Sequence, residues 1–108
     1  MHSTLIVARM QPSDSGDVAR LFAEFDATDM PHLMGTRRRQ LFGFHGLYFH
    51  LQDFDHDDGG EAIEATKQHP SFVQISDDLK QYITAYDPPS WRSPKDAMAQ
   101  RFYHWSVG

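Results

Sequence analysis

Side chains that could do chemistry gather in residues 36–52, where two strand-like runs flank His45-Gly46. A two-residue turn that ends in glycine suits a tight β-hairpin, because glycine adopts a positive φ without steric cost. Counting outward from the turn gives three of the strand pairs: Arg39 with Gln52, Leu41 with His50, and Gly43 with Tyr48. Since side chains alternate between the faces of a strand, one face of the predicted hairpin carries Arg37, Arg39, Leu41, Gly43, Tyr48, His50 and Gln52.

This face combines three useful chemical groups. Arginine is always charged and presents a planar set of donors. Histidine titrates near neutral pH, and a phenol donates a hydrogen bond. Together they suit an anionic or enolisable ligand. A solvated face of a half-buried hairpin is the alternative, because antiparallel sheets often leave one face in water.

The opposite face of the hairpin is almost entirely apolar. It carries Phe42, Phe44, Leu47, Phe49 and Leu51. A patch of this kind is rarely left in water. If helices cover the Arg39 and His50 face, the apolar face needs a second subunit, which predicts a homodimer. The reverse assignment of the two faces stays open.

The elements before the hairpin are a strand and a helix. Residues 4–10 form a β-branched and aliphatic run in which Arg9 alternates with the aliphatic residues Leu5 and Val7. Arg9 therefore either shares a face with core residues or extends to water from the strand end. A helix that Ser13 or Asp14 can cap follows, with one apolar face: Val18, Leu21, Phe22 and Phe25.

Asp26 follows Phe22 by four residues and so lies at the edge of that face, in the last turn of the predicted helix. It is either an exposed helix end or an acid turned into a cavity. Residues 28–35 are predicted to be a connection, because they include Pro31 and Gly35.

An acidic loop at residues 53–60 follows the hairpin and resembles a calcium loop in its spacing: Asp53, Asp55, Asp57 and Glu64. Asp58 stands where such a loop needs glycine for its sharp turn, and a strand leads into it. We therefore predict no metal site.

The remaining elements complete the fold class. Residues 61–69 are predicted to be a short helix, and helical spacing continues from Pro70 to Tyr86. Either Tyr82 or Tyr86 is also a candidate for lining a pocket. Residues 87–94 contain three prolines and are predicted to be a surface crossover. Residues 101–107 are predicted to be a final aromatic strand. The order βαββαβ predicts one α+β, ferredoxin-like domain over residues 1–108, a four-stranded antiparallel sheet with helices on one face.

Composition excludes several classes of protein. The formal net charge of −5 argues against a nucleic-acid partner, since phosphate binding needs a basic surface. No cysteine is present, which excludes a thiol nucleophile and a cysteine metal site. No apolar run approaches the roughly 20 residues of a membrane span, and the first residues lack signal-peptide features. A cytoplasmic protein is expected.

Residues 35–51, Gly-Thr-Arg-Arg-Arg-Gln-Leu-Phe-Gly-Phe-His-Gly-Leu-Tyr-Phe-His-Leu, resemble the tetracenomycin F2 cyclase family of small aromatic polyketide cyclases, and the spore-pigment branch most. The segments Arg9-Met10, His69-Pro70-Ser71-Phe72 and Phe102-Tyr103-His104-Trp105 are similar too. The resemblance implies a dimeric ferredoxin-like fold, with exchange of a strand between subunits as an option, and a cavity between sheet and helices. Its substrate would be a small-molecule aromatic polyketide from a type II polyketide synthase, whose components, the acyl carrier protein among them, are candidate partners.

The resemblance also implies four of the site residues, Arg39, His50, Asp26 and Arg9, and the other candidates come from the pattern of the chain itself. The catalytic candidates are His50, Arg39 and Asp26, and the substrate-binding candidates are Arg9, Tyr48, Phe25, Leu41 and Tyr82. Phe25 departs from the family's best-known member, which has histidine just before the aspartate. A mechanism that requires that histidine is excluded here.

The expected reaction is an intramolecular aldol condensation with dehydration, in antibiotic or spore-pigment biosynthesis. Arg39 and Arg9 would stabilise enolate oxygen, and His50 would act as acid and base. Asp26 would be a second base or would orient His50, and Tyr48 would hydrogen-bond a phenolic oxygen. No metal or organic cofactor is needed. The alternatives are a cofactor-free monooxygenase of the same fold type and a non-catalytic module that steers a polyketide.

Overall fold

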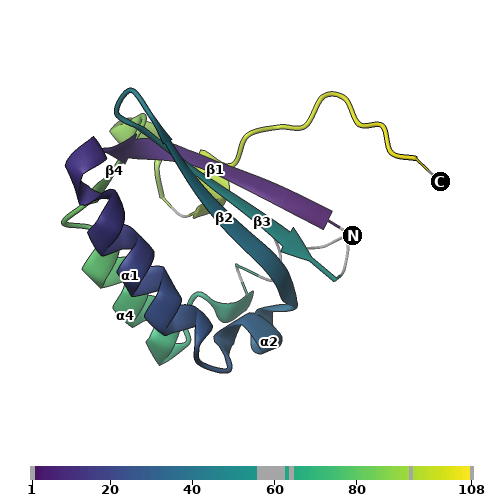
Figure 1. Cartoon of the computed structure of the whole chain (residues 1–108), viewed down its shortest axis with the longest axis horizontal. Helices are drawn as coiled ribbons and strands as arrows, with labels where there is room; N and C mark the ends of the chain where they lie inside the picture. The colour runs from purple at the N-terminus through teal and green to yellow at the C-terminus, as the bar shows by residue number, and fades with distance from the viewer. Residues whose placement is uncertain (1, 56–62, 64, 93, 108) are drawn as a thin grey trace.

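The computed structural model describes residues 2–55, 63, 65–92 and 94–107. Its sheet has four antiparallel strands in the order β2-β3-β1-β4: β1 (His2–Met10), β2 (Thr36–Phe44), β3 (Leu47–Phe54) and β4 (Ile83–Ala85). The helices α1 (Ser15–Asp26), α2 (Met30–Met34) and α4 (Pro70–Leu79) cover one face (Figure 1). Short 3-10 turns occur at Pro12–Asp14, Pro88–Ser90 and Pro94–Ala97. The predicted ferredoxin-like α+β fold is confirmed.

The hairpin has the predicted register, with Arg39 opposite Gln52, Leu41 opposite His50 and Gly43 opposite Tyr48. His45 has a φ of 50° and Gly46 a φ of 82°, the positive values that a tight hairpin turn requires at both positions. A register shift between Thr36 and Arg38 breaks the alternation at the start of β2. Arg37 is therefore not part of the predicted polar face. It is exposed and pairs with Asp55 at 3.4 Å.

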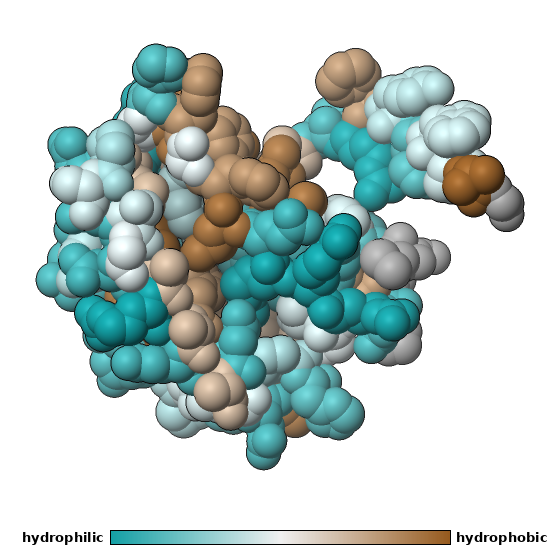
Figure 2. All heavy atoms as spheres, viewed as in Figure 1, coloured by the Kyte–Doolittle hydropathy of each residue, from teal (hydrophilic) through white to brown (hydrophobic). Residues whose placement is uncertain are grey.

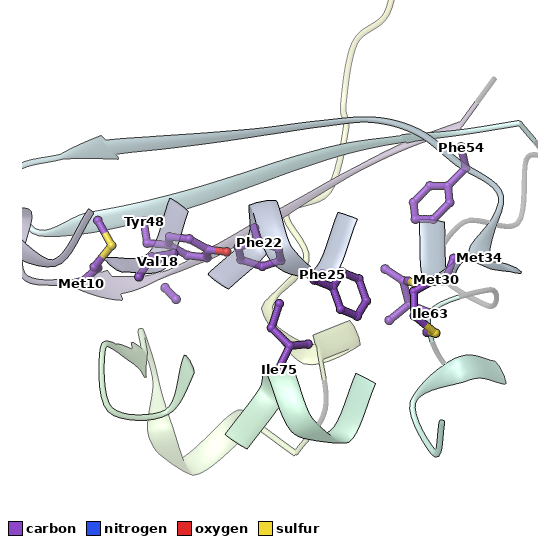
Figure 3. Packing of buried hydrophobic residues seen from close by; sticks show 11 residues of the cluster. Met10, Val18, Phe22, Phe25, Met30, Met34, Tyr48, Phe54, Ile63 and Ile75 are labelled. Carbon is purple, nitrogen blue, oxygen red and sulfur yellow. The ribbon is translucent and has the colours of Figure 1, made fainter. Parts of the chain in front are cut away.

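The core lies between the helices and the face of the sheet that carries Arg39 and His50 (Figure 3). The predicted apolar face of α1 supplies buried Val18, Phe22 and Phe25. The inward residues of β1 are Thr4, Ile6, Ala8 and Met10. The expectation that Leu5 and Val7 face the core was wrong. Both alternating sets of β1 contain apolar residues, so the sequence did not decide which set the helices cover.

The region predicted as a plain connection, residues 28–35, contains the helix α2. Pro31 lies in its first turn, and Gly35 closes it with a φ of 74°, a left-handed conformation that suits glycine after a helix. Met30 and Met34 are buried, so this short helix exists because it adds two side chains to the core.

The C-terminal part of the chain differs from the prediction in two places. The helix α4 ends at Leu79, and Ile83–Ala85 forms β4 against β1. The predicted aromatic strand at residues 101–107 is wrong, because these residues have no regular secondary structure and Phe102 is 97% exposed. The βαββαβ order survives because β4 takes the place of the final strand. Figures 1 and 2 show residues 101–107 projecting away from the body.

The acidic loop lies largely outside the described residues, as does most of the helix predicted at 61–69. Asp53 belongs to β3, and its buried carboxylate accepts hydrogen bonds from Ser3 Oγ at 2.6 Å and Arg38 Nε at 2.9 Å. Within the described ranges, no group of three or more acidic or histidine residues could hold a metal ion. No helix of the described part is long and apolar enough to cross a membrane.

Candidate active site

A cavity of about 450 Å³ lies between the sheet and the helices. Its walls are mainly apolar and aromatic, with side chains from α1, α4 and the segment after β4: Phe22, Phe25, Phe72, Ile75, Leu79 and Trp91. One wall is polar, where β2 and β3 present Arg39, Tyr48, His50 and Gln52. A cavity of this size holds a small molecule and orients it through a few polar groups.

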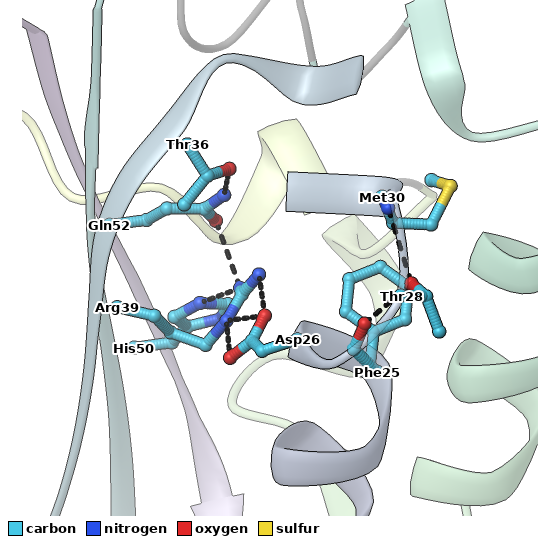
Figure 4. A network of polar contacts seen from close by, with 8 residues as sticks. All are labelled: Phe25, Asp26, Thr28, Met30, Thr36, Arg39, His50 and Gln52. Carbon is cyan, nitrogen blue, oxygen red and sulfur yellow. Dashed lines mark hydrogen bonds and ion pairs between the residues drawn. The ribbon is translucent and has the colours of Figure 1, made fainter. Parts of the chain in front are cut away.

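Arg39 is the centre of the polar wall, and its side chain is only 7% exposed (Figure 4). Its Nε donates to both carboxylate oxygens of Asp26, at 3.1 and 3.0 Å, and Nη2 donates to Oδ1 at 2.9 Å. Nη1 lies 2.8 Å from His50 Nε2 and 3.3 Å from Gln52 Oε1. The guanidinium also lies over the Phe22 ring, 4.9 Å from its centroid. The forked shape of arginine makes these simultaneous contacts possible.

His50 is buried on β3, with its ring edge-on to Phe22 at a centroid distance of 5.1 Å. Burial, and secondly the charge of Arg39, lowers the pKa of His50 from its ordinary value of 6.5 to about 3. The imidazole is therefore neutral at pH 7. We had expected a group that titrates near neutral pH. The difference arises because the helices remove the ring from water and disfavour its charged form.

We expect His50 to make the fold sensitive to acid. Its folded-state pKa lies below the unfolded value, so the unfolded chain binds more protons between pH 6.5 and 3, and stability falls as the pH falls. Between pH 7 and pH 5 this residue should lower the free energy of unfolding by about 2 kcal/mol. Urea unfolding of the wild type and of His50→Gln at both pH values measures the difference. Equal pH dependence of the two proteins would contradict the expectation.

Tyr48 lies two residues before His50 on the same face of β3 and is buried in the cavity wall. Burial raises the pKa of its phenol well above the ordinary value, although the charge of Arg39 opposes this. Tyr48 is therefore a neutral hydrogen-bond donor at physiological pH. Opposite it on β2, an added Cβ at Gly43 would meet only ordinary contacts, the nearest with Met10 Cε at 3.6 Å.

Two other predicted site residues stand at this wall. Phe25 lines the cavity and lies beneath the Arg39 guanidinium, 5.6 Å from it. Asp26 is 38% exposed in its side chain and contacts Arg39, not His50. Asp26 was expected to act as a second base or to orient His50. Because it contacts Arg39 and not His50, it can orient His50 only through Arg39.

Three predicted substrate-binding residues do not line the cavity. Leu41 and Tyr82 are partly buried and pack against the hydrophobic core. Arg9 lies on the opposite face of the sheet, where its guanidinium stacks 4.4 Å from the centroid of the Tyr86 ring. The alternation of β1 puts Ala8 and Met10 inside and Arg9 outside, so Arg9 cannot share this cavity with Arg39.

Gln52 was not among the predicted site residues; it is 1% exposed and donates from Nε2 to Thr36 Oγ1 at 2.6 Å. The hairpin register did place it opposite Arg39 on the polar face, which was the available signal. Lys80, Trp91 and Arg92 also line the cavity. They come from segments after the hairpin, and no local pattern connected them with it.

Comparison with known proteins agrees with this architecture. The model of the polyketide synthesis cyclase family matches residues 2–106. The chain belongs to this family. An uncharacterized protein of Streptomyces coelicolor, SCO5314, is 51% identical over 106 residues, which is 97% of this chain and 95% of that protein. Tetracenomycin F2 cyclase of Streptomyces glaucescens is 42% identical over 106 residues, 98% of this chain and 95% of that protein.

The solved structure of that enzyme, a type II polyketide cyclase, superimposes on this cyclase-family chain with a TM-score of 0.91. The match covers 100% of both chains at 41% identity. A crystal structure of an antibiotic biosynthesis monooxygenase matches with a TM-score of 0.53 at 14% identity, over 77% of this chain and 86% of that one. At this identity the likeness extends to the fold alone.

Proposed function

We propose that this cyclase-family protein directs the regiospecific intramolecular aldol cyclisation and dehydration of a poly-β-ketone or partly cyclised aromatic intermediate. The observation that carries the proposal is the mainly apolar cavity with a polar wall on the hairpin. An aromatic polyketide presents flat apolar surface and a row of carbonyl oxygens. The aromatic walls would pack on the flat apolar surface. Arg39, His50 and Tyr48 would donate hydrogen bonds to the carbonyl oxygens. The pathway class is antibiotic or spore-pigment biosynthesis.

The reaction is a rearrangement of bonds within the substrate followed by loss of one water molecule. A methylene between two carbonyl groups loses a proton to water, and the resulting enolate carbon forms a bond with a second carbonyl carbon. The alkoxide formed there takes up a proton. Its hydroxyl group then leaves with a neighbouring hydrogen as water, and enolisation of the remaining ring carbonyl groups gives the aromatic ring. No metal or organic cofactor enters this sequence.

The protein's main task is to select which two carbons meet. The methylene protons of β-diketones are already acidic, so the barrier to enolisation is modest. Holding the two carbons in contact contributes through positioning. Donors placed where oxygen gains negative charge lower the barrier further.

The test is to add the purified protein to a reconstituted minimal type II polyketide synthase, with the substrate either free or carried on the acyl carrier protein. We expect the product spectrum to move from misfolded shunt products to one cyclised aromatic compound. An unchanged spectrum in both formats would contradict the proposal.

The same assay separates the two alternatives. Cyclisation proceeds without oxygen, whereas a cofactor-free monooxygenase stops under anaerobic conditions. A module that only binds the polyketide would keep its effect when the polar wall is altered. Loss of rate with retained affinity in His50 and Arg39 variants excludes that alternative.

We also propose that two copies associate through the outer face of the sheet. That face exposes Phe42 and Phe44, 50% and 64% exposed, and the helices of the described residues cover the other face (Figure 1). The tail at residues 101–107 carries further exposed apolar side chains: Phe102, Tyr103, Trp105 and Val107. Exposed apolar surface of this extent is characteristic of a protein interface.

Sedimentation should therefore show a dimer at micromolar concentration. Deleting residues 101–108 should weaken the dimer, because the aromatic tail is expected to pack on the second copy. The control is a Lys95→Ala variant, which removes an exposed charge and leaves the tail intact. A folded monomer from the full chain would contradict the assembly.

A further inference from the structure

The hydrogen-bond roles in the polar wall follow from Arg39, because a guanidinium has donors and no acceptor. Its Nη1 lies 2.8 Å from His50 Nε2 and 3.3 Å from Gln52 Oε1. Both neighbours must therefore accept. Nε2 of His50 carries no proton, and the neutral ring must hold its single proton on Nδ1.

Gln52 and Thr36 hold Arg39 in this arrangement. The Gln52 amide is fully buried, accepts from Arg39 through Oε1 and donates through Nε2 to Thr36 Oγ1 at 2.6 Å. A reversed amide would face Arg39 with a second donor. Arg39 thus selects the amide orientation, and the Thr36 hydroxyl holds the amide in it by accepting from Nε2 (Figure 4). On the far side of Arg39, Asp26 binds Nε and Nη2.

The Nδ1 atom of His50 is available to a ligand. No group in the described residues accepts a hydrogen bond from Nδ1. Among the described side chains, Thr4 Oγ1 is the only polar atom that lacks both a partner and contact with solvent, so Nδ1, which lacks a partner, must contact solvent. Nδ1 therefore keeps accessible surface, and His50 lines the cavity. The Tyr48 hydroxyl, two residues away, likewise has no partner in the described residues and keeps accessible surface in the cavity.

We propose that Arg39 fixes His50 as the Nδ1–H tautomer, so that His50 donates a hydrogen bond to a carbonyl or enolate oxygen of the substrate and does not remove the substrate's proton. The inference rests on the proposed cyclisation for its substrate. Arg39, Gln52 and Thr36 are then positioning residues for His50. The Tyr48 hydroxyl supplies a second donor to the same substrate, at that oxygen or its neighbour.

Two physical effects favour this role over that of a base. The lone pair of Nε2 is occupied by Arg39, so the ring has no free acceptor toward the cavity. The positive charge on one side of the ring polarises the N–H on the other side, which strengthens donation to an oxygen that gains negative charge. The facing groups from neighbouring elements are Arg39 on β2, Tyr48 on β3 and Phe22 on α1, and none is an acidic side chain that would favour a protonated ring.

The tautomer is measured directly on the free protein by long-range ¹H–¹⁵N correlation of the histidine rings. The nitrogen that couples to both ring protons is Nε2, and in His50 it should show the shift of an unprotonated nitrogen, unchanged from pH 8 to pH 5. A protonated Nε2, or titration of His50 within that range, would overturn the inference. This result does not depend on the cyclase assay, so a failed assay removes the proposed function and leaves the tautomer assignment standing.

The positioning chain is tested with a matched pair at Thr36. Thr36→Val keeps the shape and loses the hydroxyl, whereas Thr36→Ser keeps the hydroxyl. We expect Thr36→Val to lower kcat about fivefold, the factor that one ordinary hydrogen bond supplies, with little change in KM and with a new population of the other tautomer in the spectrum. Thr36→Ser should restore both readouts. If Thr36→Val leaves the His50 spectrum and kcat as in the wild type, the chain does not position His50.

Discussion

Substituting lysine for Arg39 is expected to lower turnover by at least about 10²-fold, the effect of removing a donor group from a preorganised site. The ammonium keeps the charge, but a point charge cannot contact Asp26, His50 and Gln52 together as the planar fork does. The substrate should also cyclise at the wrong carbons, because the polar wall loses its fixed geometry. Turnover and product distribution in the reconstituted synthase measure both effects.

The matched control is Arg38→Lys. Arg38 is the neighbouring residue on β2, but its side chain is 64% exposed and pairs with Asp53 outside the cavity. We expect this variant to keep the rate and the product. If Arg39→Lys behaves like Arg38→Lys in both respects, the polar face of the hairpin is not the active site, and the solvated face weighed in the sequence analysis would be the correct interpretation.

A bulky side chain at Ser76 is expected to abolish turnover by filling the cavity. Ser76 lies on α4 and lines the cavity from the side opposite the sheet. A tryptophan there occupies space that the substrate needs while it leaves Arg39 and His50 untouched. We expect a loss of at least about 10²-fold, since misplacing a substrate by about 1 Å already costs that much.

Gln74→Trp provides the control for Ser76→Trp. Gln74 is exposed on the same helix, does not line the cavity, and makes one exposed hydrogen bond to Asp78. Far-ultraviolet circular dichroism and the thermal unfolding midpoint should be close to the wild type in both variants, which separates blocked access from altered folding. Full activity of Ser76→Trp would show that the reaction takes place elsewhere.

Much of the hairpin could be predicted from local sequence. The His45-Gly46 turn fixes the register, because a two-residue loop permits only one pairing of the flanking strands. The register in turn places Arg39, Tyr48, His50 and Gln52 on one face. The amphipathic spacing of α1 likewise predicted Val18, Phe22 and Phe25 as its core residues.

Local patterns failed where two periodicities fit the same residues. Tyr82, Ile83 and Tyr86 continue the helical spacing of α4, yet Ile83–Ala85 forms β4 because β1 offers an unpaired edge at Ala8 and Met10. Residues 101–107 have the composition of a strand, but within the described chain no strand edge pairs with them. Strand pairing is a long-range event, so composition alone does not decide it.

The chemistry of the site was decided by tertiary structure. The sequence determined that an arginine, a histidine and a phenol share one face of a hairpin. Only the packing of α1 and α4 over that face removed His50 from water and lowered its pKa to about 3. The same packing brought Asp26 to Arg39, and covering the Ala8 and Met10 side of β1 left Arg9 on the outer face. Burial and the identity of the charged neighbours set a pKa and a tautomer, and both are properties of the assembled fold.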